Sequence, residues 1–149
     1  MHRARSGDLG ANEIIRMLAL KPHPEGGHYA QTYPSDRTGS DRPASTSIYY
    51  LLQADEVSAW HKVDAEEHWL WHAGSALSLS LAPPQGKGVS SSVLGPDLRA
   101  GQRPQCAIPA DYWQTAECLG AWCLVSCIVA PGFQFSGFEL APPDWRPEL

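Results

Sequence analysis

Ser58-Ala59-Trp60-His61-Lys62-Val63-Asp64-Ala65-Glu66-Glu67-His68-Trp69-Leu70-Trp71-His72-Ala73-Gly74 is the stretch of sequence that decides the fold. It gathers three of the chain's six histidines and three of its six tryptophans. The alternation of its side chains predicts a strand over 58–63, a turn at 64–66 and a second strand over 67–72, which ends at Gly74. The centre of the chain is therefore predicted to be a β-hairpin.

The predicted hairpin places a candidate proton-transfer pair beside large aromatic rings. His61 and Val63 share one face of the first strand, and Glu67, Trp69 and Trp71 share one face of the second. Folding the turn brings His61 and Glu67 together, and partial desolvation would move the pKa of each group toward neutral pH. The alternative is a surface ion pair next to tryptophans that only pack the core, and this stretch alone favours neither.

The length of the chain suits a single domain. Its 149 residues can bury a sizeable core, and we expect this domain to span residues 11–141. Residues 1–10 are predicted to be a flexible tail, and residues 142–149 a Pro-rich C-terminal tail.

Charge and cysteine content exclude several classes of protein. A formal net charge of −5 without long charge runs argues against nucleic acid as a partner. The four cysteines form no metal-type CxxC pair, and we expect them to be reduced thiols; they are Cys106, Cys118, Cys123 and Cys127. No apolar run reaches transmembrane length and the N-terminus lacks the apolar segment of a signal peptide, so we expect a soluble, cytoplasmic protein that binds no membrane.

One short helix and many short strands are predicted outside the central stretch. Asn12 is the predicted N-cap of an amphipathic helix, because apolar residues recur at helical spacing after it. Thirteen glycines and thirteen prolines separate short alternating or apolar runs that predict strands. This pattern indicates the all-β class, and we expect a double-stranded β-helix, or jelly roll, because that barrel leaves few exposed strand edges.

Two spaced motifs resemble the signatures of the cupin superfamily. The first signature is His-x-His, then a Glu and a Gly; His61, Val63, Glu67 and Gly74 stand at these places. The second is a Pro-x-Gly turn followed by a His, and Gln114 stands at the place of that His. The resemblance implies a cupin barrel in which two metal-binding histidines are missing, so we expect no metal and no cofactor.

A narrower resemblance involves three further segments. The chain is similar to a group of single-domain cupin-like proteins that share a His-Pro-Glu-Gly-Gly turn, a Ser-Thr-x-Ile-Tyr-Tyr-Leu-Leu strand and a Pro-Gly-Phe; residues 23–27, 45–52 and 131–133 match them. That group is in turn similar to epimerases of nucleotide-linked (dTDP) keto-deoxy sugars. This similarity implies His61 as the catalytic base and a homodimer that pairs through the N-terminal strand.

Two residues depart from the epimerase pattern. Gln31 stands where the epimerases carry a nucleotide-contacting Glu, and Ile128 and Val129 stand near the place of their general-acid Tyr. Tyr49 or His72 would have to replace that acid. The pocket is therefore expected to be kept while the epimerase chemistry is open, since a fold does not fix a function.

Three functions follow from these patterns. The first is a small-molecule-binding cupin whose pocket holds a nucleoside diphosphate or nucleotide-sugar. Its predicted ligand-binding residues are Tyr29, Gln31, Ser47, Tyr49, Trp69, Trp113 and Gln114, with Arg37 or Arg42 on the diphosphate. The second is an epimerase or isomerase with His61 as base, oriented by Glu67. The third is a metal-dependent enzyme, for which only His61, Glu67 and Gln114 are available as ligands.

Overall fold

Short alternating runs separated by turns build nearly all of the fold. The computed structural model describes residues 9–34 and 41–149. Its elements are α1 (Ala11–Met17), β1 (Lys21–Pro22), β2 (His28–Tyr33), β3 (Thr46–Gln53), β4 (Val57–Val63), β5 (Glu66–Gly74), β6 (Leu77–Ala82), β7 (Ser90–Leu94), η2 (Leu98–Ala100), β8 (Gln105–Ile108), β9 (Trp113–Cys118), β10 (Trp122–Ala130), η3 (Phe135–Gly137) and β11 (Phe138–Leu140).

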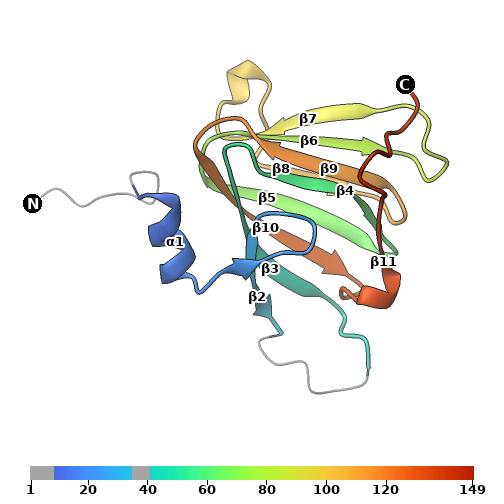
Figure 1. Ribbon diagram of the computed structural model, residues 1–149, viewed down its shortest axis with the longest axis horizontal. Helices are drawn as coiled ribbons and strands as arrows, with labels where there is room; N and C mark the ends of the chain where they lie inside the picture. Colours follow the sequence, from blue (N-terminus) through green and yellow to red (C-terminus); the bar gives the residue numbers. More distant parts are fainter. Residues whose placement is uncertain (1–8, 35–40) are drawn as a thin grey trace, which may run out of the picture.

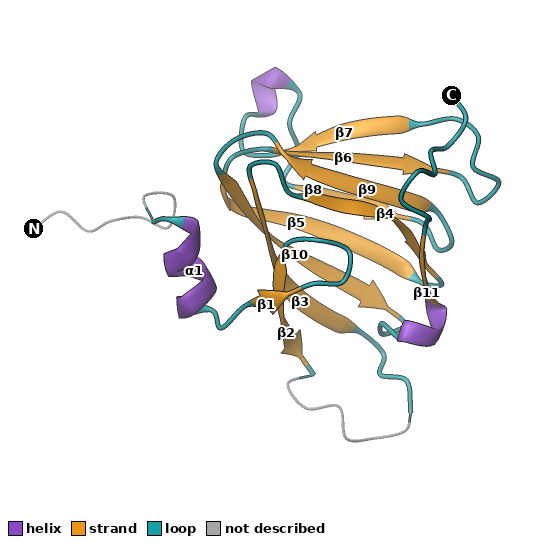
Figure 2. Cartoon of the chain, viewed as in Figure 1, coloured by secondary structure: helices purple, strands orange, loops and turns teal. Residues whose placement is uncertain are grey.

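The strands form two antiparallel sheets that face each other (Figures 1 and 2). Sheet A has the order β1-β2-β3-β10-β5-β8, and sheet B has the order β11-β4-β9-β6-β7. Strands that follow each other in the chain often lie in different sheets, which is the arrangement of a jelly roll. The predicted all-β double-stranded β-helix with one short N-terminal helix is therefore confirmed.

The central stretch is not a hairpin. β4 pairs with β9 and β11 in sheet B, whereas β5 pairs with β10 and β8 in sheet A. The turn between β4 and β5 crosses from one sheet to the other, so His61 and Glu67 approach each other across the interior of the barrel. The predicted strand boundaries were nearly right, but the predicted pairing of these two strands was wrong.

The main core fills the space between the two sheets. Its fully buried members come from both of them and include Tyr50, Trp69, Leu79 and Val125. Inward residues of β6 alternate with outward serines, as expected for a strand that is buried on one face. The core occupies one part of the barrel and leaves a hollow in another, where the site described below is found.

Helix α1 covers the outer face of sheet A. Ile14 packs with Leu51 and Trp122, and the indole nitrogen of Trp122 donates to the carbonyl oxygen of Leu9 at 3.0 Å. The helix begins at Ala11, so its N-cap is Gly10 and not the predicted Asn12; the Gly10 amide donates to Oε1 of Glu13 at 3.1 Å. No helix among the described residues is long and apolar enough to cross a membrane.

Both predicted tails have a part that packs against the barrel. Residues 1–8 of the N-terminal tail lie outside the described residues. The C-terminal segment lies along sheet B, where the ring of Trp145 is 4.4 Å from that of Trp113 and 5.8 Å from that of Trp60. Glu148 exchanges two backbone hydrogen bonds with the loop after β6, through Gly86 and Gly88. The C-terminal segment is therefore an integral layer of the fold.

Candidate functional site

The turn before β2 carries a buried carboxylate into the barrel. Glu25 is 8% exposed and lies between Pro24 and a pair of glycines with positive φ, Gly26 at 113° and Gly27 at 76°. A Cβ atom on Gly26 would collide with the carbonyl oxygen of Val57. The turn packs this closely against β4 only because Gly26 has no side chain.

A bulge in β4 receives this turn. Ser58 pairs with Ala116 and His61 pairs with Gln114, so two residues of β4, Ala59 and Trp60, lie opposite one residue of β9. The Ala59 amide donates to the backbone carbonyl of Glu25 at 2.9 Å, and the Ala59 carbonyl lies 2.7 Å from Nδ1 of His61. The bulge therefore fixes Glu25 and His61 through one residue, consistent with the frequent use of bulges to aim side chains at sites.

Glu25 and His61 form a buried pair at hydrogen-bonding distance. Nε2 of His61 lies 3.0 Å from Oε2 of Glu25, and the two side chains are 2% and 7% exposed, in that order. Burial raises the pKa of Glu25 and lowers the pKa of His61, and both shifts favour a neutral acid and a neutral imidazole. Because Nδ1 of His61 faces the Ala59 carbonyl, it carries a hydrogen, and Nε2 is left to accept the proton of Glu25.

Glu67 supplies a second carboxyl group from the opposite sheet. It accepts a hydrogen bond from Nε2 of Gln114 at 2.8 Å, and Oε1 of Gln114 accepts from Nε1 of Trp69 at 2.8 Å. Burial raises the pKa of Glu67 to about 7, with a smaller contribution from the charge of Glu25; the charge of His61 and the Gln114 hydrogen bond act in the opposite direction. A carboxyl group with this pKa can donate or accept a proton near neutral pH.

These groups line one side of a cavity of about 90 Å³ between the sheets. The apolar side is formed by Ile48, Val63, Val129, Phe133, Phe135 and Phe138. His23 also lines the cavity; its Nδ1 accepts from the Glu25 amide at 3.1 Å, and burial lowers its pKa. No Lys or Arg of the described residues lines the cavity, which favours a ligand that is uncharged where it enters.

The geometry of the barrel agrees with a family match over most of the chain. Residues 12–141 match the family described as Cupin superfamily (DUF985). The chain belongs to this cupin family. A solved protein from Shewanella oneidensis is 36% identical to this cupin, with a TM-score of 0.82 over 89% of this chain and 85% of that chain. A hypothetical protein from Leishmania major is 27% identical, with a TM-score of 0.79 over 89% of this chain and 88% of that chain.

More distant structures share the fold with this cupin. A dTDP sugar isomerase from Desulfovibrio desulfuricans G20 is 17% identical, with a TM-score of 0.56 over 84% of this chain and 82% of that chain. An oxalate decarboxylase from Bacillus subtilis is 9% identical, with a TM-score of 0.62 over 80% of this chain and 29% of that chain. At these identities the similarity concerns architecture alone. No curated protein matches the chain.

Four predicted site residues of this cupin line the cavity. They are His61, Glu67, Tyr29 and Gln31. Gln31 lies at the exposed end, where its amide nitrogen donates to the carbonyl of Pro34 at 2.7 Å. Two others, Trp69 and Gln114, lie behind the cavity wall and are 0% and 1% exposed. Trp69 therefore holds Gln114 in place and does not meet a ligand in the cavity. This corrects its prediction as a ligand-binding residue.

Three predicted ligand-binding residues face away from the cavity, which corrects the sequence analysis. Thr46 and Ile48 of β3 point into the cavity. Ser47 and Tyr49 alternate with them along the strand and therefore point outward. Trp113 lies on the outer side of sheet B, packed on Trp145. In each case the neighbouring residue of the strand takes the inward position.

The suggested diphosphate ligands and general acids are also placed elsewhere. The guanidinium of Arg42 binds both carboxylate oxygens of Asp64, at 2.6 and 3.2 Å, and its Nε donates to the carbonyl of Gly132. Arg37 lies outside the described residues. Tyr49 and His72 lie together on the outer face of sheet A, with ring centroids 6.4 Å apart, and neither reaches the cavity. Inside the barrel, Glu25 and Glu67 are the acidic residues that line the cavity among the described residues.

Sequence reasoning missed Glu25, the partner of His61. The His-Pro-Glu-Gly-Gly turn carried a signal for it. Two adjacent glycines allow a turn to approach another backbone closely, so a Glu beside them can be brought into the interior. The three phenylalanines of the cavity wall were also missed; they follow the Pro131 break and pack edge to face, with the ring centroids of Phe133 and Phe135 5.0 Å apart.

The positions at which cupins bind a metal do not fit an ion here. Val63 has no donor atom, and the amide of Gln114 is already bound to Glu67 and Trp69. Nε2 of His61 faces Glu25. Within residues 9–34 and 41–149, no three His, Cys, Asp or Glu side chains are grouped to hold a metal ion. The side chains at these positions are occupied by contacts with one another.

Proposed function

We propose that this cupin binds a small carbonyl-bearing sugar between its sheets and moves a proton on it, as an isomerase or epimerase does. One observation carries the proposal: the Glu25–His61 pair, joined at 3.0 Å, lies in the same cavity as Glu67, whose pKa is raised to about 7. Moving a proton between carbon and oxygen needs one group that accepts and one that donates, and both must be poised near neutral pH.

The two ring nitrogens of His61 decide how the base works. Nδ1 faces Ala59 and Nε2 faces Glu25, so the imidazole has no free nitrogen for a substrate. Glu25, which lines the cavity, therefore meets the substrate. It first passes its proton to Nε2 of His61, and the carboxylate that this transfer leaves then acts as the base. This exchanges the roles expected from the sequence, in which His61 was the base and a carboxylate its orienting partner.

The proposed step conserves atoms and electrons. Glu25 removes the proton from the carbon next to the carbonyl, and protonated Glu67 gives its proton to the carbonyl oxygen, which yields an enol. For the epimer, the same carbon is protonated on its other face and Glu67 takes back the proton of the enol oxygen. For the isomer of a hydroxy-carbonyl sugar, the former carbonyl carbon is protonated and Glu67 takes the proton of the neighbouring hydroxyl, which becomes the new carbonyl. No oxidant or reductant is consumed. The carboxyl groups end in their starting protonation states after the reverse transfers.

The nature of the cavity limits the ligand. Its volume of about 90 Å³ lies below the usual range of small-molecule sites, and no Lys or Arg of the described residues lines it, so it suits a short neutral molecule or the carbonyl-bearing end of a sugar. A nucleotide-linked sugar, the ligand class predicted from the sequence, fits this proposal if the sugar enters and the nucleotide stays outside near Tyr29 and Phe135. The fold similarity to a dTDP sugar isomerase supports only the barrel as a frame for such chemistry.

Exchange with heavy water tests the proposal directly. The protein is incubated in D₂O with free keto- and aldo-sugars and with a dTDP-linked keto-deoxyhexose, and NMR follows the hydrogen next to the carbonyl. We expect deuterium to enter one of these substrates with the wild type and not with His61→Asn. His68→Asn is the matched control, because His68 is 45% exposed on the outer face of β5. Absence of exchange in all substrates would contradict the proposal.

A binding protein without catalysis is the second candidate, because aromatic residues surround the exposed end of the cavity. In that case a nucleoside diphosphate or nucleotide-sugar raises the melting temperature, with a stabilisation of about 2.7 kcal/mol at a hundredfold excess over Kd, without any exchange. The homodimer also stays a prediction; a sedimentation mass of one chain at micromolar concentration would contradict it.

A further inference from the structure

A second hollow lies on the outer face of sheet B, remote from the barrel cavity. Its volume is about 350 Å³, larger than that of the cavity between the sheets. The floor is made by small outward side chains of three neighbouring strands: Ala59 of β4, Thr115 of β9, and Ser78 and Ser80 of β6. Because these side chains are short, the chain segment that crosses above them leaves a groove.

The C-terminal segment forms the wall and roof of this groove. It continues from β11 along β4, where the Ala141 amide donates to the Trp60 carbonyl at 2.9 Å. Trp145 is anchored on Trp113, with ring centroids 4.4 Å apart, and meets Trp60 edge to face. The bulge in β4 contributes here too, because it turns both Ala59 and Trp60 outward into the groove. The groove thus has an aromatic end.

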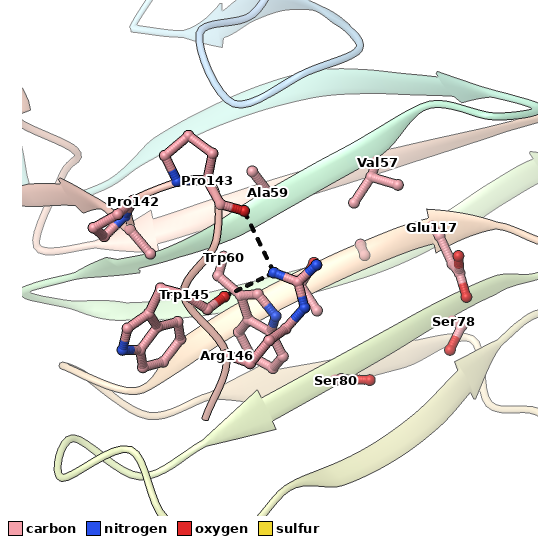
Figure 3. Close-up of a pocket in the computed structure, with 13 residues that line it drawn as sticks. Val57, Ala59, Trp60, Ser78, Ser80, Glu117, Pro142, Pro143, Trp145 and Arg146 are labelled. Atoms are coloured by element: carbon pink, nitrogen blue, oxygen red, sulfur yellow. Dashed lines mark hydrogen bonds between the residues drawn. The ribbon is translucent and has the colours of Figure 1, made fainter. Parts of the chain in front are cut away.

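Arg146 extends its guanidinium over the floor of the groove. Its Nη1 donates to the backbone carbonyl of Trp145 at 2.8 Å and lies 3.5 Å from that of Pro143, and the side chain is exposed to solvent (Figure 3). Among the residues that the structure describes, no carboxylate forms an ion pair with Arg146. An oriented guanidinium without a carboxylate partner is suited to bind an anionic group through two parallel N–H donors.

The remaining lining residues are suited to hydroxyl groups. Ser78 lies directly across from Glu117 in the β6–β9 register, and Ser80 lies across from Thr115. Figure 3 shows Glu117 and Ser78 together at the end of the groove away from Trp145. A carboxylate and hydroxyl oxygens accept hydrogen bonds from the hydroxyls of a sugar, whereas the tryptophans offer apolar faces for its ring.

We infer that this groove binds a sugar acid or a sugar phosphate, with its anionic group on Arg146 and its hydroxyls toward Ser78 and Glu117. The charge, the aromatic end and the hydroxyl end each match one part of such a ligand. The volume of about 350 Å³ also lies within the usual range of small-molecule sites. This site shares no lining residue with the barrel cavity, so the inference does not depend on the proposed isomerase.

Indole NMR signals locate the binding. ¹⁵N-labelled protein is titrated with D-glucuronate and with glucose 6-phosphate, and with neutral glucose and inorganic phosphate as reference ligands. We expect the indole signals of Trp60 and Trp145 to shift with one or both anionic sugars, and that of the enclosed Trp69 to stay. The two anionic sugars distinguish a carboxylate from a phosphate as the recognised group.

Arg146→Gln should weaken this binding by about tenfold or more, because it removes a charge-assisted contact. Arg103→Gln is the matched control: its Nη1 also donates to two backbone carbonyls, at 2.8 and 3.4 Å, but Arg103 does not line the groove. The inference is overturned by a Kd weaker than about 10 mM for both anionic sugars. Equal affinity for neutral glucose or for phosphate alone, or unchanged affinity in Arg146→Gln, also overturns it.

Discussion

Oε2 of Glu25 lies 3.0 Å from Nε2 of His61, and a single residue of the β4 bulge, Ala59, holds both residues in place. The amide of Ala59 binds the backbone of Glu25, and its carbonyl fixes the tautomer of His61. A turn with two glycines and a bulge in β4 are thus both required to form the pair. The contact between the two side chains therefore depends on backbone geometry as much as on the side chains themselves.

Glu25→Gln should preserve the fold and abolish proton transfer. The side-chain amide that this substitution introduces can donate to Nε2 of His61 in place of the carboxylic acid, but it cannot give up its proton. We expect a melting temperature close to that of the wild type and a loss of solvent-deuterium exchange of about a hundredfold or more. Glu66→Gln, at a side chain that is 67% exposed, is the control. Exchange that survives in Glu25→Gln would assign the base to another residue.

The fold and two of the site residues could be predicted from the sequence because they depend on alternation within single strands. Alternation put His61 with Val63 and Glu67 with Trp69 on shared faces, and the structure has each pair pointing into the barrel. The partner of His61 could not be predicted in the same way. Glu25 reaches it from a turn before β2, and no local pattern encodes the contact between that turn and the bulge of β4.

The aromatic residues show why the rest of the predicted pocket was partly wrong. Tyr29 lines the cavity, whereas Tyr49 and Trp113 lie on outer faces of the two sheets. Outer faces of this barrel are covered by α1 and by the C-terminal segment. Aromatic side chains can therefore be half-buried on either face, and hydrophobicity alone does not choose the side.

Glu67→Gln should change how stability depends on pH. Burial raises the pKa of Glu67 from 4.5 to about 7, so the native state holds a proton that the unfolded state has lost between these pH values. The contribution of Glu67 to stability is therefore fully present below pH 4.5 and falls as the pH rises to about 7, by about 3 kcal/mol in total. Glutamine does not titrate, so the variant does not lose this stability as the pH rises.

Urea unfolding from pH 4 to pH 8 measures the difference between Glu67→Gln and the wild type. We expect the difference to move in favour of the variant by about 3 kcal/mol between pH 4.5 and about pH 7, and to be constant above that range. Taking the difference removes titrations that both proteins share, including those of most surface groups. The same comparison for Glu66→Gln should be nearly flat. A flat difference for Glu67→Gln would show that its carboxyl ionises at an ordinary pH.

Gly26→Ala should destabilise the protein more than an alanine at another glycine with positive φ. Gly26 has φ 113°, and its added Cβ would collide with the Val57 carbonyl, so the turn that carries Glu25 must move. Gly88→Ala is the control, because Gly88 has φ 83° and nothing lies within 4 Å of its added Cβ. We expect about 1 kcal/mol for Gly88→Ala and at least about 2 kcal/mol more for Gly26→Ala by urea unfolding. Equal costs would contradict the close approach of the turn to β4.

Gln114→Leu should raise the pKa of Glu67 beyond its value of about 7. The hydrogen bond from Nε2 of Gln114 to Oε1 of Glu67, 2.8 Å long, favours the ionised carboxylate, and leucine removes it without opening the site to water. A ¹³C NMR titration of the Glu67 carboxyl group measures the shift. Trp69→Phe serves as the comparison, because it removes the donor to Oε1 of Gln114 and leaves the hydrogen bond from Gln114 to Glu67 in place.

Trp69→Phe should cost at least about 1–3 kcal/mol of stability, since it leaves a buried amide oxygen without its partner and puts a smaller ring at a fully buried position. The hydrogen bond from Gln114 to Glu67 is retained in this variant, so the pKa of Glu67 should stay near its value of about 7. An equal rise of the pKa in both variants would mean that Trp69 is needed to orient the Gln114 amide. No rise in Gln114→Leu would instead show that the amide does not stabilise the charged form of Glu67.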